Sequence, residues 1–176
     1  IRAGNFVHTE NEMKNHFQES EDKVMVLTEK EKTTIKDLQT QEKSCITKYE
    51  KYAMQAKDTE LQSLFRTLQK DEQKHYQSLE QALSGNVPSC DCNDTQGKEY
   101  CPCGTYKDGG NATDKENDNF LATDCIGTEK LVSGTYNADV FNCDNTNLRK
   151  LFADIQIEEQ NHAEMLNKYK QVNGMM

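Results

Sequence analysis

Residues 61–79, LQSLFRTLQKDEQKHYQSL, recur 87 positions later as residues 148–166, LRKLFADIQIEEQNHAEML. The same shift aligns residues 38–83 with 125–170 without a gap, and 12 of the 46 residue pairs are identical. Two unrelated segments of this length would share about three. A repeat at a fixed spacing indicates a supersecondary unit that occurs twice. We therefore expect two copies of one structural unit.

Each copy is predicted to be a pair of helices, because its apolar residues recur at intervals of three and four. Thr28 and Glu31 form a capping box that predicts the first helix start. Gly85 and Gly174 follow the last apolar residues of the two copies and predict helix ends. The four helices are expected at residues 29–56, 59–83, 124–141 and 146–173. Short turns make each pair an antiparallel hairpin.

A connection of about 40 residues, 84–123, separates the two hairpins and is rich in Gly, Asn, Asp and Cys. One hairpin alone buries too little surface to be stable. We therefore expect an all-α domain over 28–173, a four-helix bundle of two duplicated hairpins joined by a long crossover, with 1–27 as an N-terminal extension. The alternative is a disordered linker between two independent hairpins.

The composition argues against several classes of protein. The chain has 21 basic and 30 acidic residues, a formal net charge of −9 and no basic cluster, so nucleic acid and anionic membrane surfaces are not expected partners. No apolar run approaches the roughly 18 residues that a membrane span needs. The first 30 residues lack a signal-peptide pattern, although a leader could have been removed before Ile1.

Six ionisable residues interrupt the apolar stripes of the predicted helices. Two glutamates lie seven residues before Tyr49 and Tyr136, on the inward faces of the first helix of each hairpin. A Glu-x-x-His motif lies on the inward face of the second helix of each hairpin. The six residues are Glu42, Glu72, His75, Glu129, Glu159 and His162.

Four carboxylates in an apolar interior require positive charge, because burying a single unpaired carboxylate costs several kcal/mol. No Lys or Arg interrupts the inward stripes at these levels. Two divalent ions would supply four positive charges, and this distribution of ligands over four helices is typical of di-iron and di-manganese carboxylate proteins. We expect two Fe or Mn ions per chain. The alternative is a bundle that has kept these residues but no longer binds metal.

The motifs Glu72-Gln-Lys-His75 and Glu159-Gln-Asn-His162, with Glu42 and Glu129, resemble the ligand set of the ferritin-like superfamily over residues 30–171. This superfamily includes rubrerythrins, bacterioferritins and manganese catalases. The resemblance implies that the glutamates of the two Glu-x-x-His motifs bridge the metals. An internal rubredoxin module is not expected, because Cys101-Pro-Cys103-Gly104 is one residue short of its knuckle.

A narrower resemblance covers residues 28–83. The segments Glu31-Lys-Thr, Lys36-Asp-Leu-Gln-Thr-Gln-Glu42 and Leu61-Gln-Ser-Leu-Phe65 resemble the ferritin-like spore coat proteins of clostridia and bacilli, the coat F type. This resemblance implies a place in the spore coat. Without it, a cytoplasmic protein would be expected.

The function expected from the metal site is oxidase or peroxidase chemistry on Fe(II), dioxygen or peroxide, as in a di-iron oxidoreductase of ferroxidase or peroxidase type. Tyr49 and Tyr136 could relay electrons or bond a ligand in that reaction. The favoured interpretation makes both of them core aromatics with satisfied hydroxyls. The alternative function is a structural coat subunit, cross-linked by disulfides, in which metal stabilises the bundle or the site is vestigial.

The chain has seven cysteines, four of them in the predicted connection. Neither Cys-x-Cys pair has the Cys-x-x-Cys spacing of a metal knuckle, so disulfides are favoured over a zinc or iron–sulfur site. A homo-oligomer is expected. Because an odd number of cysteines excludes complete internal pairing, disulfides within the connection and a link between chains both stay open. In a reducing compartment all would be thiols. The cysteines of this link would be Cys90, Cys92, Cys101 and Cys103.

The predicted connection also contains an acidic segment. Asp114, Glu116 and Asp118 alternate like the start of a calcium loop, but the glycine and the twelfth-position glutamate of an EF-hand do not follow. We expect a solvated acidic loop.

Overall fold

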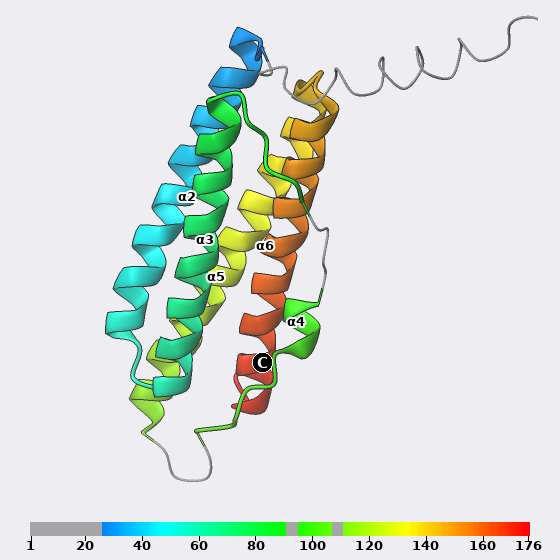
Figure 1. Ribbon diagram of the computed structural model, residues 1–176. Helices are drawn as coiled ribbons and strands as arrows, with labels where there is room; N and C mark the ends of the chain where they lie inside the picture. Colours follow the sequence, from blue (N-terminus) through cyan, green and yellow to red (C-terminus); the bar gives the residue numbers. More distant parts are fainter. Residues whose placement is uncertain (1–25, 91–94, 107–110) are drawn as a thin grey trace, which may run out of the picture.

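A computed structural model describes residues 26–90, 95–106 and 111–176 (Figure 1). The described residues form five α-helices and one short 3-10 helix, and they contain no strand. The α-helices are α2 (Glu29–Gln55), α3 (Thr59–Leu83), α4 (Gln96–Glu99), α5 (Ala112–Asp139) and α6 (Thr146–Val172), and the 3-10 helix spans Val140–Asn142. The predicted all-α class is confirmed. None of the helices in these ranges combines the length and apolarity that crossing a membrane would require.

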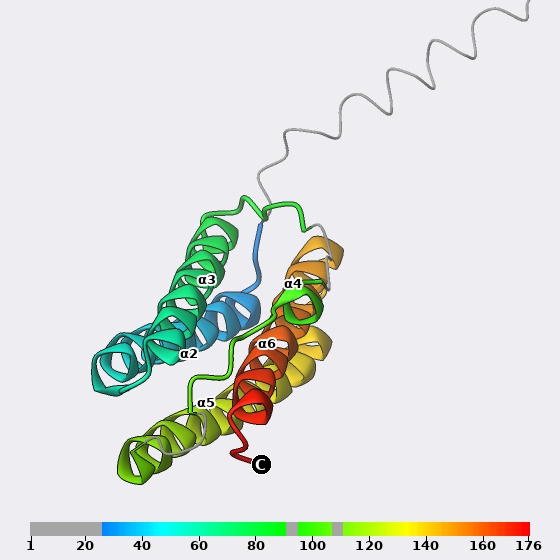
Figure 2. The ribbon, with the colours of Figure 1, turned by 90° about the horizontal axis from the view of Figure 1, so that it is seen from below.

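The four long helices pair in chain order. Helix α2 packs along α3 and α5 along α6, while contacts of α2 with α5 and of α3 with α6 join the two pairs. All four lie side by side, as the two views show (Figures 1 and 2). Helix α3 ends at the end of the assembly opposite to the start of α5, so α3 and α5 run in the same direction (Figure 1).

Local signals set the helix ends of the first hairpin. The Thr28 side chain accepts a hydrogen bond from the Glu31 backbone N–H, and the Glu31 carboxylate accepts one from the Thr28 backbone N–H, which is the predicted capping box. Asp58 caps α3 through the backbone N–H of Glu60. Gly85 has a φ of 91°, a left-handed conformation that favours glycine just after a helix. The predicted limits of both helices are confirmed to within one residue.

Helix α5 corrects the prediction, because it begins at Ala112 and not near residue 124. Asn111 caps the helix by accepting hydrogen bonds from the backbone N–H groups of Thr113 and Asp114. The polar residues that follow resemble a loop in composition, yet they form the first three turns of the helix. Because α5 begins at Ala112, the connection between the hairpins is residues 84–111. The helix ends at Asp139, where the chain enters the 3-10 helix.

Asp118 also corrects the prediction of a solvated acidic loop, because its side chain is fully buried. Its carboxylate accepts hydrogen bonds from the backbone N–H of Lys57 at 2.9 Å and of Asp58 at 2.8 Å, and from the Tyr106 hydroxyl at 2.7 Å. The Asn117 side chain also donates to it at 3.0 Å, and a buried carboxylate with four donors is satisfied without a cation. The acidic residue therefore anchors α5 to the start of α3.

The same contact occurs at the other end of the molecule. Glu31, which precedes Asp118 by 87 positions, accepts hydrogen bonds from the backbone N–H groups of residues 144 and 145 at 3.0 and 3.1 Å. These two residues are in turn 87 positions after 57 and 58. The first helix of each hairpin thus holds the start of the second helix of the other hairpin. The sequence repeat is also a repeat of tertiary contacts.

Apolar side chains pack in two clusters along the helices. The first cluster includes Phe65 and Tyr169, and the second cluster includes Ile35 and Phe152. On α3, Leu68 belongs to the first cluster and Leu79 to the second, and the Glu-x-x-His motif lies between them. The ionisable residues that interrupt the apolar stripe of α3 therefore lie between the two apolar clusters, near the middle of the helix. Apart from its last two residues, the predicted N-terminal extension 1–27 lies outside the described residues.

Candidate metal centre

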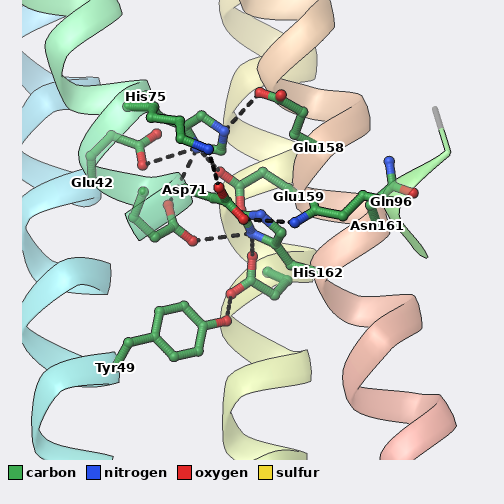
Figure 3. A network of polar contacts seen from close by, with 12 residues as sticks. Glu42, Tyr49, Asp71, His75, Gln96, Glu158, Glu159, Asn161 and His162 are labelled. Atoms are coloured by element: carbon green, nitrogen blue, oxygen red, sulfur yellow. Dashed lines mark hydrogen bonds and ion pairs between the residues drawn. The ribbon is translucent and has the colours of Figure 1, made fainter. Parts of the chain in front are cut away.

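The six ionisable residues singled out in the sequence lie together in the middle of the four long helices (Figure 3). Each is at most 3% exposed. Helices α2 and α5 supply one glutamate each, and α3 and α6 supply one Glu-x-x-His motif each. The residues are Glu42, Glu72, His75, Glu129, Glu159 and His162.

These residues form two overlapping groups that could each hold an ion. Within each group, one N or O atom of every member lies within 4.8 Å of the corresponding atoms of the others. Glu72 and Glu159 belong to both groups. The first group adds Glu42 and His75 to this pair, and the second adds Glu129 and His162. Because a carboxylate has two oxygens, the two shared glutamates could bind one ion with each oxygen.

The His75 ring nitrogen Nδ1 faces three carboxylates. It lies 3.6 Å from Oε2 of Glu42, 3.4 Å from Oε2 of Glu72 and 3.3 Å from Oε1 of Glu159. Two ligand atoms that are each about 2.1 Å from one ion lie about 3.0 to 3.4 Å apart in octahedral or tetrahedral coordination. The spacing therefore fits ligands of a common ion better than it fits direct hydrogen bonds.

The second histidine repeats this arrangement. Nδ1 of His162 lies 3.3 Å from Oε1 of Glu72, 3.4 Å from Oε2 of Glu129 and 3.5 Å from Oε2 of Glu159. The two imidazole rings are stacked, with centroids 5.6 Å apart and planes inclined by 16°. Each histidine thus presents one nitrogen to its own set of three carboxylates.

Hydrogen bonding within the cluster is incomplete. Nine buried side-chain nitrogen and oxygen atoms in the described residues lack a hydrogen-bond partner, and all nine belong to the six residues of the cluster. No Lys or Arg is among the buried residues in the described ranges. Unpartnered buried polar atoms are rare in native proteins because each costs about 1 to 3 kcal/mol. These nine atoms therefore require a partner that the described part of the polypeptide does not provide.

The protonation of the metal-free cluster reflects burial and mutual repulsion. Burial raises the pKa of Glu42 to about 7. Attraction to His75 lowers this pKa, and repulsion from Glu72 raises it. Burial and the charges of Glu72 and Glu129 raise the pKa of Glu159 well above its usual value. Burial alone would lower the pKa of both histidines, but the carboxylates around them raise it well above the usual value. These directions favour protonation of Glu42, Glu159 and both histidines when no metal is bound, whereas His162 and His75 lower the pKa of Glu72 against its burial.

Two buried tyrosines bond to the cluster from opposite hairpins. The Tyr49 hydroxyl of α2 donates to Oε1 of Glu129 on α5, and the Tyr136 hydroxyl of α5 donates to Oε1 of Glu42 on α2. Both rings are at most 1% exposed. They are core aromatics with satisfied hydroxyls, as the favoured interpretation predicted. A role for them in electron transfer stays a prediction.

Glu158 is a functional candidate that the sequence analysis missed. Its Oε2 lies 2.7 Å from Nε2 of His75, the ring nitrogen that points away from the other carboxylates (Figure 3). A carboxylate on the second nitrogen fixes the tautomer and orientation of a metal-binding imidazole. Glu158 is half-exposed and lies off the apolar stripe, so periodicity did not select it. The signal available was its position directly before Glu159 in the repeat.

The corresponding contact is absent on the other histidine. Asp71 stands at the place in the first repeat that Glu158 occupies in the second. Its carboxylate accepts hydrogen bonds from the Gln96 side chain at 2.7 Å and from the Lys74 ammonium at 2.6 Å. Nε2 of His162 has no hydrogen-bond partner among the described residues. The two halves of the cluster are therefore chemically unequal.

The cysteines lie in two kinds of environment. Cys101 and Cys103 are exposed, whereas Cys45, Cys125 and Cys143 are buried and form no disulfide with another cysteine of the described residues. Burial raises the pKa of the Cys143 thiol to about 11, a shift that disfavours the thiolate. Cys92 lies outside the described residues. The disulfide link between chains stays a prediction.

The fold and the site define an all-helical protein with a buried carboxylate–histidine cluster. Residues 117–176 match the family model of the Coat F domain. The matched segment holds most of α5 and all of α6, whereas the segments that resemble coat F proteins lie in the first hairpin. The match points to a spore coat protein and agrees with the location that the resemblance implied. No curated protein and no solved structure matches the chain.

Proposed function

We propose that this chain is a ferritin-like protein of the spore coat whose buried cluster holds two iron or manganese ions. The observation that carries this proposal is the set of nine unpartnered buried atoms, all on six residues. Two divalent ions would supply four positive charges against four carboxylates in a region that contains no buried Lys or Arg among the described residues. Carboxylate and imidazole ligands suit Fe and Mn.

In this proposal each residue of the cluster has a role. Glu42 and His75 would hold one ion, and Glu129 and His162 the other. The two shared glutamates would bridge the ions, since each belongs to both groups. One glutamate from each of two helices and one Glu-x-x-His from each of the other two is the ligand pattern of ferritin-like bundles.

Two such ions supply one-electron chemistry toward dioxygen or peroxide when bound. The polypeptide contributes a site from which bulk water is excluded, since every member is at most 3% exposed. The hydroxyls of Tyr49 and Tyr136 hold Glu129 and Glu42 in place across the hairpin boundary. We propose that the protein is an oxidase or peroxidase of this type, with Fe(II), dioxygen or peroxide as reactants.

Anaerobic titration of metal-free protein with Fe(II), followed by exposure to peroxide, tests this function. The proposal expects two ions per chain and a change in near-ultraviolet absorbance after exposure. A variant with Glu72→Gln and Glu159→Gln keeps the shape of the shared ligands but removes two negative charges, and it is expected to lose both signals. Wild-type protein that binds no Fe(II) would contradict the proposal.

The second candidate function is a structural coat subunit, which the Coat F match favours. In this case metal would only stabilise the fold, because ligand binding contributes folding free energy whatever chemistry follows. The exposed Cys101 and Cys103 would join neighbouring chains. Electrophoresis of coat extracts with and without reducing agent separates the two functions. Disulfide-linked oligomers, together with loaded protein that does not consume peroxide, would favour the structural subunit.

A further inference from the structure

A pocket of about 500 Å³ opens between α5 and α6 and extends to the buried cluster. Glu129 and Glu159 are among its lining residues, although each is at most 1% exposed. Other residues that line it are Ile126, Lys130, Ser133, Ala163, Glu164 and Lys168. An ion that reaches six such deeply buried residues from solvent needs a route between helices. This pocket ends at two of them, Glu129 and Glu159.

The internal repeat explains why the pocket lies on this side of the molecule. Ser133 and Ala163 line it, and the residues at the same positions of the first hairpin are Ile46 and Tyr76. All four positions are half-buried, and the side chains of Ile46 and Tyr76 are much larger than those of Ser133 and Ala163. The two hairpins share the glutamates and histidines of the cluster but differ by two large side chains in the wall outside it.

The charges of the pocket favour a cation at its inner end. Both carboxylate oxygens of Glu159 and Oε2 of Glu129 lack hydrogen-bond partners. Lys168 does not offset them, because its ammonium donates to the backbone carbonyls of Gly97 and Lys98 and pairs with Glu164 at 3.1 Å. Lys130 is exposed to solvent. The unpartnered carboxylate oxygens of Glu159 and Glu129 therefore lie at the inner end of the pocket.

We propose that the pocket between α5 and α6 is the entrance through which a divalent metal ion reaches the cluster. The inference rests on the proposed function, since it assumes that the cluster binds metal. The small side chains of Ser133 and Ala163 make the opening. The wall of the first hairpin, with Ile46 and Tyr76, stays closed to the ion.

The test installs the wall of the first hairpin in the second. Metal-free full-length protein with Ser133→Ile and Ala163→Tyr is mixed with Co²⁺ in a stopped-flow instrument, and the visible absorbance of bound Co²⁺ is followed. We expect uptake to slow by about tenfold or more, as a barrier higher by about 1.4 kcal/mol would require. The final Co²⁺ content is expected to stay at that of the wild type, because no ligand has changed.

Two further variants serve as controls. Ile46→Ser with Tyr76→Ala opens the first hairpin by the reverse exchange and is expected to take up Co²⁺ at least as fast as the wild type. Ala163→Met fills the pocket with one flexible side chain and is expected to give a smaller slowing, which preserves the test if the double substitution prevents folding. Circular dichroism reports on folding for all variants.

The outcomes distinguish this inference from the function beneath it. Full Co²⁺ content reached at the wild-type rate in both filled variants would overturn the entrance alone. Wild-type protein that binds no Co²⁺ would overturn the proposed function and the entrance together. Slowed uptake with unchanged content supports both.

Discussion

Nε2 of His75 lies 2.7 Å from a carboxylate oxygen of Glu158, whereas Nε2 of the equivalent His162 has no hydrogen-bond partner in the part of the chain that the structure describes. The two histidines occupy matching positions of an internal repeat and face matching sets of carboxylates. The difference therefore arises outside the cluster, where the repeat has Glu158 in one copy and Asp71 in the other. The two ion-binding halves are expected to differ in affinity.

We expect Glu158→Gln to weaken one of the two bound ions by about 10- to 100-fold, because loss of the carboxylate on His75 removes the partner that orients the ring. Calorimetric titration with Co²⁺ should resolve one weakened and one unchanged site. Asp71→Asn is the matched control, since Asp71 bonds to Gln96 and Lys74. Equal weakening by both substitutions would contradict the role of Glu158.

We expect Tyr49→Phe to lower the free energy of unfolding of the metal-free chain by about 1 to 3 kcal/mol, since it removes the hydroxyl bonded to the buried Glu129. Tyr136→Phe should have the same effect through Glu42. Urea denaturation measures both. Tyr76→Phe is the control, because that ring is only half-buried and lies outside the cluster. Equal losses in all three variants would show that the contacts to the glutamates are not the cause.

We expect Asp118→Ala to destabilise the chain by about 3 kcal/mol, because it leaves the backbone N–H groups of Lys57 and Asp58 without an acceptor in a buried region. Thermal unfolding checks this. Glu116→Ala, at an exposed position of the same helix, is expected to change stability by less than about 0.5 kcal/mol. If Asp118→Ala changed stability as little as Glu116→Ala, the result would contradict the anchoring role of Asp118 and favour the predicted solvated loop.

We expect the metal-free chain to lose stability as the pH rises. A group whose pKa is higher in the folded than in the unfolded chain stabilises the fold at low pH, and this contribution is lost as the pH passes the folded pKa. For Glu42 the pKa rises from 4.5 to about 7, and the two histidines shift in the same direction. The free energy of unfolding should fall by about 1 kcal/mol between about pH 6 and pH 8.

Metal-loaded chain is the control for this pH dependence. Bound metal requires deprotonated ligands, so its stabilising effect should grow as the pH rises over the same range. Chemical denaturation at several pH values, with metal and with a chelator, measures both slopes. Slopes of the same sign would contradict a cluster that exchanges protons for metal.

The helical hairpins could be predicted because their signals are local. The capping box of Thr28 and Glu31 fixes one helix start, and the repeat supplies a second, independent copy of the pattern. The cluster could be located for the same reason, since carboxylates on an apolar stripe are visible in one dimension. These features depend on residues three to seven positions apart.

The features that the sequence did not reveal depend on contacts between distant residues. Asp118 is buried because its carboxylate accepts hydrogen bonds from the backbone N–H groups of Lys57 and Asp58, which lie about 60 positions away in the sequence. Glu158 gains its importance only when α3 brings His75 beside it. The pocket depends on small side chains, Ser133 and Ala163, that line it between two packed helices. The spacing of apolar residues along the sequence does not predict such a gap.

Anomalous scattering from crystals of protein prepared from its native source, measured at the Fe and Mn absorption edges, tests the central claim most directly. The account predicts two peaks between the carboxylates of Glu72 and Glu159, the glutamates shared by both groups of ligands. A map without anomalous peaks there, in which only water or a lysine side chain meets those carboxylates, would contradict it.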